Sequence, residues 1–82
     1  MSNYSNNKRS FPYEGQNLEY FIKDIKFNIH NGMEWATGIM LIFDENHTHK
    51  DTFSVSDERN KLLHAMPDDA KIWYEDYKNS QK

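Results

Sequence analysis

The strongest structural signal in this chain is IKFNIHNGMEWATGIMLIF, residues 25–43. On its N-terminal side apolar and polar residues alternate, which is the period of a half-buried strand. Asn31 and Gly32 then separate this run from a second apolar run. Both residues tolerate the positive φ of a type I′ turn, so the stretch predicts a β-hairpin with a two-residue turn.

A two-residue turn also determines which side chains share a face of the hairpin, because side chains alternate along each strand. It places Asn28 opposite Trp35, with Phe27 and Ile29 on one face and Trp35 and Met33 on the other. Helices that cover only the Phe27 face would leave Trp35 directed outward.

The hairpin is expected to extend into a larger sheet. Residues 39–43 form a continuous apolar run, which is typical of a central strand covered on both faces. Gly38, opposite Ile25, leaves room for a large neighbour or a bulge. Residues 44–51 are polar and predict a connection, and residues 52–55 resume the alternation of a third strand.

Residues 17–24 allow two interpretations. Their apolar spacing fits a short helix capped by Asn17, or a strand with a bulge near Lys23 and Asp24. Aromatic and β-branched residues dominate and nothing interrupts the chain before Ile25, which favours the strand.

The C-terminal segment has the period of an amphipathic helix. Ser56 or Asp57 can cap it, and Pro67 interrupts it, because proline lacks a backbone donor but starts a helix well. The apolar stripe continues through Leu62, Leu63, Met66, Ala70, Trp73 and Tyr77. The predicted fold is α+β: a small three- or four-stranded antiparallel β-meander, covered on one face by one kinked or two short C-terminal helices.

Length and composition predict one small domain. The 82 residues are 37% hydrophobic, and the 15% of aromatic side chains supply the area for a core. Residues 1–10 are polar and are expected to form a flexible tail before a single domain at residues 11–82. The sequence has no cysteine, no secretory signal and no long apolar run, which predicts a cytoplasmic protein without a membrane partner.

No residue pattern predicts catalysis or a cofactor. The acids occur as neighbours on the predicted helices, where their side chains diverge, and the three glycines are too far apart for a phosphate loop. His47 and His49 are weak metal-ligand candidates, with Asp44 and Asp51 nearby. With no cysteine and no third ligand at a recognisable spacing, we predict neither an enzyme nor a metal site.

Aromatic and acidic residues favour a binding function instead. An outward Trp35 beside Met33 resembles an interface hot spot, although a small cluster closed by residues 11–13 would also account for it. The helical aromatic residues occupy more than one helix face, so they cannot all be core. The candidate binding residues on the helices are Trp73, Tyr74, Tyr77, Asp68, Asp69, Glu75 and Asp76.

The leading hypothesis is a non-enzymatic protein-binding module, an inhibitor or regulator like the accessory proteins of phages and mobile elements, acting through this aromatic patch and acidic surface. Its partner would be another protein, such as one that handles nucleic acid, or a second copy of the chain. The alternative is a single-stranded nucleic-acid binder that stacks bases on Tyr and Trp, but a net charge of −3 disfavours direct contact with nucleic acid. The third hypothesis is a His-based metal-binding protein.

Overall fold

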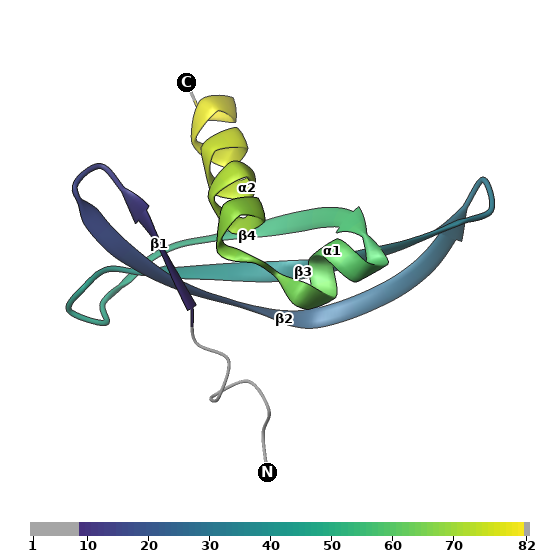
Figure 1. Cartoon of the computed structure of the whole chain (residues 1–82), viewed down its shortest axis with the longest axis horizontal. Helices are drawn as coiled ribbons and strands as arrows, with labels where there is room; N and C mark the ends of the chain where they lie inside the picture. The colour runs from purple at the N-terminus through teal and green to yellow at the C-terminus, as the bar shows by residue number, and fades with distance from the viewer. Residues whose placement is uncertain (1–8, 82) are drawn as a thin grey trace, which may run out of the picture.

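The computed structural model describes residues 9–81, which form four strands followed by two helices. The strands pair antiparallel in chain order, and both helices pack on one face of the sheet (Figure 1). The elements are β1 Arg9–Tyr13, β2 Gln16–His30, β3 Met33–Phe43, β4 His49–Glu58, α1 Arg59–His64 and α2 Pro67–Ser80. The predicted α+β meander is confirmed, with four strands and two separate helices.

The first strand begins before the predicted domain boundary. Residues 1–8 of the predicted tail lie outside the described residues, but Arg9 already pairs with β2, so the sheet starts two residues before position 11. The Arg9 guanidinium donates a hydrogen bond to the carbonyl oxygen of His64 at 2.8 Å. Phe11 is buried, with its ring centroid 5.9 Å from that of Tyr74. These contacts tie β1 to the helices.

The central hairpin has the predicted turn and register. Asn31 and Gly32 adopt φ values of 53° and 77°, as a type I′ turn requires. Asn28 pairs with Trp35 in the ladder, which confirms the two-residue loop.

Residues 17–24 belong to β2, so the strand interpretation is confirmed and the helical one is wrong. The pairing with β3 shifts between Lys23 and Lys26, where Asp24 has a φ of 54°. This is the predicted bulge. Because an extra residue in one strand increases its bend and twist, the long β2–β3 hairpin curves along its length (Figure 1).

Gly38 allows β3 to lie close to the bulge. A Cβ atom at this position would be 2.6 Å from Cγ2 of Ile22 and 3.2 Å from the carbonyl oxygen of Lys23. The expectation that Gly38 leaves room for a bulge is therefore confirmed.

The core lies between the sheet and the helices. Tyr74 is at its centre, with ring centroids 4.9 Å from Tyr13 and 6.0 Å from Phe53. The Tyr20 hydroxyl donates a hydrogen bond to the carbonyl oxygen of Ala65. Ala65 lies in the connection between the two helices and ends α1 with a φ of 45°. The buried side chains are Phe11, Leu18, Tyr20, Ile22, Ala36, Met40, Ile42, Val55, Leu62, Ala70 and Tyr74.

One helix begins at the residue that the sequence predicts, and the other does not. Pro67 starts α2 as expected. The predicted cap at Ser56 or Asp57 is wrong, because β4 stays paired with β3 through both residues. The Asp57 carboxylate instead accepts a hydrogen bond from Nε1 of Trp73 at 3.0 Å. In residues 9–81, neither helix has the length and apolar character needed to cross a bilayer.

Candidate functional site

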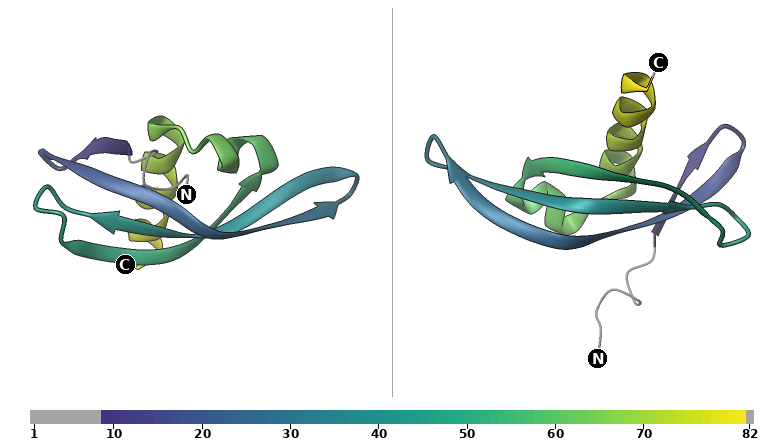
Figure 2. Two further views of the ribbon diagram at one scale, coloured as in Figure 1. Left: turned by 90° about the horizontal axis from the view of Figure 1, so that it is seen from below. Right: turned by 180° about the vertical axis from the view of Figure 1, so that it is seen from behind.

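The sheet has one covered face and one open face. Along β3 the side chains of Ala36, Met40 and Ile42 are fully buried under the helices. The alternate side chains point to the other face, over which no element packs within residues 9–81 (Figures 1 and 2). We call this apolar surface the open face; its residues are Phe21, Met33, Trp35, Ile39, Leu41 and Phe43.

The open face departs from the usual chemistry of an exposed sheet face. Antiparallel sheets with one solvated face normally alternate apolar and polar side chains. Residues 39–43 are instead apolar on both faces, as the sequence indicates for a strand covered twice, whereas the described residues supply only one cover. Within residues 9–81, no segment of the chain covers the second face of this strand.

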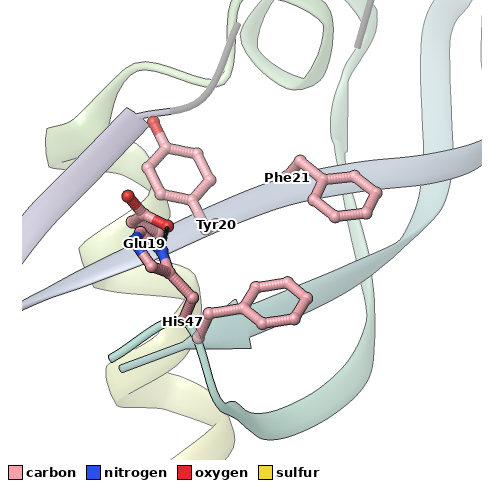
Figure 3. Close-up of a pocket in the computed structure, with 5 residues that line it drawn as sticks. Glu19, Tyr20, Phe21 and His47 are labelled. Carbon is pink, nitrogen blue, oxygen red and sulfur yellow. Dashed lines mark hydrogen bonds and ion pairs between the residues drawn. The ribbon is translucent and has the colours of Figure 1, made fainter. Parts of the chain in front are cut away.

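One end of the open face has a fixed aromatic arrangement. The rings of Phe21 and Phe43 stack, with centroids 6.0 Å apart and planes 8° apart. Glu19 Oε1 lies 2.9 Å from Nδ1 of His47 beside them (Figure 3). These four residues and Tyr20 line a hollow of 140 Å³, which is smaller than the roughly 300 Å³ of the smallest drug-sized ligand sites. It has the dimensions for a side chain of a partner.

A second depression lies at the bulge. It has a volume of 420 Å³ and includes open-face positions of all three longer strands, Lys26, Thr37, Ile39 and Ser54, together with Asp24, Ile25 and Gly38. Interfaces commonly seat an anchoring side chain in a hollow, and this one combines the apolar Ile25 and Ile39 with charged and polar side chains.

Beyond the bulge, the β2–β3 hairpin extends past the helices as an arm, residues 27–35 (Figure 1). Phe27 and Ile29 face the helix side, which confirms the predicted faces, yet they remain 53% and 72% exposed. The cover expected over these two residues is therefore wrong. α1 begins at Arg59, directly after Glu58 pairs with Trp35 at the end of β4, and runs away from the arm towards α2 (Figure 1). Arg59, with its guanidinium carbon 5.1 Å from the Phe27 ring centroid, reaches the base of the arm.

Acidic and basic side chains occur on both sides of the sheet. The open-face positions of β2 and β4 hold Lys23 and Lys26 against Glu19 and Glu58, so they are balanced. The two helices carry the candidate acids Asp68, Asp69, Glu75 and Asp76 together with four cations, so their charges are balanced as well; the cations are Arg59, Lys61, Lys71 and Lys78. Of the predicted binding residues, Met33 and Trp35 lie on the open face, whereas the helical aromatic residues belong to α2, which also carries the candidate acids.

The helical aromatic candidates face the sheet. Tyr74 is fully buried and its hydroxyl donates a hydrogen bond to the Asp51 carboxylate at 2.7 Å. Burial, followed by this contact with Asp51, raises the pKa of Tyr74 above its usual range. Tyr77 stacks on Phe53, with centroids 4.4 Å apart. Tyr74 therefore belongs to the core, while Tyr77 and Trp73 are partly exposed at its margin.

The remaining candidates lie as follows. Met33 is 48% exposed and Trp35 half-buried, both on the open face. Residues 11–13 pack against the helices, so they do not close a cluster over Trp35. His47 pairs with Glu19, whereas His49 Nε2 lies 2.6 Å from Oγ1 of Thr52. Within residues 9–81, no three His, Cys, Asp or Glu side chains are grouped to hold a metal ion.

Four open-face residues were missed by sequence reasoning: Phe21, Ile39, Leu41 and Phe43. The unbroken apolar run at residues 39–43 is the signal that could have identified three of them.

Comparison with known protein families, with curated proteins and with solved structures found no match to this chain. Its function therefore has to be inferred from its own residues.

Proposed function

We propose that this chain is a small non-enzymatic protein-binding module that docks a partner protein on its open face. The observation that carries this proposal is β3, which is apolar on both faces but covered on one by residues 9–81. Met33 is exposed and the other five open-face side chains are half-buried, and a contiguous apolar surface that remains accessible is typical of protein interfaces. Its burial would contribute about 25 cal/mol for each Å² removed from water.

The size of the surface agrees with a protein partner. Residues 35–43 of β3, which pair with β4 as well as β2, extend about 30 Å, and three strands are about 14 Å wide, so this part of the sheet has a plan area of about 400 Å². A stable complex buries about 800 Å² on each partner. The hairpin arm, with exposed Phe27 and Ile29 on its other face, supplies further area if a partner wraps around it.

The composition of the open face also favours protein over nucleic acid. Trp, Phe and Met are enriched at protein interfaces, and Trp is a frequent hot spot. Base stacking requires accessible aromatic rings along a basic groove. Here Phe21 and Phe43 stack on each other, aliphatic Ile39 and Leu41 lie along the same face, and two lysines are balanced by two glutamates.

Such a module would act in the cytoplasm as an inhibitor or regulator, by occupying a surface that its partner needs. The acids of the helix side would remain exposed in this complex. Within α2, four acids stand against Lys71 and Lys78, and this excess would steer the module towards a basic partner, such as a protein that handles nucleic acid.

Affinity capture from a nuclease-treated lysate of the source organism tests the proposal. Met33→Glu places a charge on the open face and should remove the captured protein. Ile72→Glu is the matched control, because Ile72 is 53% exposed on α2, close to the 48% of Met33. Loss of the partner in both variants, or capture that requires intact nucleic acid, would contradict the proposal.

A further inference from the structure

A second surface lies at the free edge of the sheet. β4 pairs with β3 and is the last strand in the sheet order. The helix α2 crosses the sheet and extends beyond β4 (Figures 1 and 2). A hollow of 310 Å³ lies between them, lined by Phe53, Ser54, Val55, Ser56, Trp73, Asp76, Tyr77 and Ser80.

This hollow runs along the edge of β4. Val55 is buried on the covered face, whereas Ser54 and Ser56 are exposed on the other face. A hollow lined by consecutive residues of both faces must include the strand edge. An edge strand presents outward N–H and C=O groups that can pair with a further strand, and within residues 9–81 none occupies this side.

The wall above the edge is fixed in place. Trp73 donates its indole N–H to Asp57 at 3.0 Å, and Tyr77 stacks on Phe53 with planes 8° apart. Asp76 is exposed and is the only charged side chain in the lining described. The hollow thus combines strand pairing, aromatic contact and one carboxylate.

We propose that the edge of β4 beneath α2 binds an extended segment of another protein as an added strand, with a Lys or Arg of that segment beside Asp76. Strand addition takes affinity from backbone hydrogen bonds and specificity from alternate side chains. On the α2 side the segment would carry apolar residues around its cation, and on the other side polar residues beside Ser54 and Ser56. The proposal is independent of the open face.

A single segment fits this edge better than a second copy. An added strand occupies about 4.8 Å of width. A twofold pairing of β4 strands about an axis normal to the sheet would bring a second α2 over the same edge, where the first already extends (Figure 1).

NMR with two synthetic peptides tests the proposal. The probes are acetyl-Thr-Val-Thr-Lys-Thr-Val-Thr-amide and the same peptide with Glu at its centre. The Lys peptide should shift the backbone amides of residues 53–56 and the indole N–H of Trp73, and should slow hydrogen exchange at the outward amides of β4. It should bind more tightly than the Glu peptide.

Two neighbouring acids provide a matched pair of variants. Asp76→Asn should reduce the preference for the Lys peptide by about two- to fivefold, as expected for an exposed ion pair. Glu75→Gln removes the same charge, but Glu75 lines a different hollow with Tyr13 and Lys71, so the preference should persist. Met33→Glu should bind the peptide like the wild type, which separates this site from the open face.

Three results would overturn the proposal. The first is no shift at residues 53–56 with either peptide at millimolar concentration. The second is an equal effect of Asp76→Asn and Glu75→Gln. The third is a concentration-dependent dimer that already protects the β4 amides without peptide, since this would assign the edge to a second copy.

Discussion

Gly38→Ala tests the packing that bends the β2–β3 hairpin. Two physical effects of opposite sign contribute to its change in the free energy of unfolding. Replacing glycine by alanine in an open strand stabilises a protein by about 0.5–1 kcal/mol through the entropy of the unfolded chain. At Gly38 the new methyl would lie 2.6 Å from Cγ2 of Ile22 and 3.2 Å from the Lys23 carbonyl oxygen. Both distances are shorter than an ordinary carbon contact.

The contact with Ile22 cannot be relieved cheaply. Ile22 is 7% exposed, and its Cγ2 methyl is attached directly to Cβ, so moving it shifts the backbone or forces a strained rotamer. Overpacking of this kind costs about 1–3 kcal/mol. We therefore expect a net loss of about 0.5–2 kcal/mol, which corresponds to about 2–16 °C in Tm for a domain of this size.

Urea unfolding followed by circular dichroism measures this change. Ile22→Leu provides the second variant, because leucine has similar volume but lacks the methyl that the new Cβ meets. In a double-mutant cycle, Gly38→Ala should cost less when Ile22→Leu is present, with a coupling energy of about 1 kcal/mol. A neutral or stabilising Gly38→Ala, or an absence of coupling, would refute the reasoning.

Three further perturbations address the core, the hairpin turn and the histidines. Burial and the hydrogen bond to Asp51 raise the pKa of Tyr74. Above pH 10 this tyrosine therefore loses its proton more readily in the unfolded chain than in the folded one, and the free energy of unfolding falls as pH rises. Tyr74→Phe should flatten this alkaline decline in urea titrations, and an unchanged slope would contradict the assignment. Gly32→Ala, at a φ of 77°, should cost about 1–2 kcal/mol because a Cβ disfavours this conformation, and equal midpoints of thermal unfolding would exclude the type I′ turn. Micromolar zinc should leave the ring resonances of His47 and His49 unshifted, since Nδ1 of His47 contacts Glu19 whereas Nε2 of His49 contacts Thr52; a saturable shift of both would revive the metal hypothesis.

Local chemistry was sufficient to predict the hairpin. Asn31-Gly32 fixes the turn through its positive φ values, and the two-residue loop then determines the register and the faces. The bulge near Lys23 followed from the need to change face between two apolar patterns. Pro67 marked the start of α2 for an equally local reason.

The sequence predictions were wrong where contacts between residues far apart in the chain determine the structure. Asp57 has the chemistry of a helix cap, but Trp73 donates to its carboxylate and β4 continues past it. Tyrosine is a common residue type at protein interfaces, but the Tyr74 hydroxyl donates a hydrogen bond to the Asp51 carboxylate within the core. Neither partner is visible in the local sequence pattern.

The open face was only half predicted for the same reason. The register placed Met33 and Trp35 on it, and the run at residues 39–43 indicated a strand covered twice. Periodicity shows that side chains share a face but does not show how far a helix extends. The exposure of Phe27 and Ile29 depends on the direction in which α1 leaves β4 and on the curvature of the hairpin, which only the assembled fold determines.

Site-specific photo-crosslinking tests the proposed docking on the open face most directly. Benzoylphenylalanine is introduced in place of Met33 or, as the control, in place of Ile72, and each protein is irradiated in a nuclease-treated lysate. The label at position 33 should crosslink one protein, and an excess of unlabelled wild type should prevent this, whereas unlabelled Met33→Glu should not. No specific protein crosslink at position 33, or the same crosslink from position 72, would contradict docking on the open face.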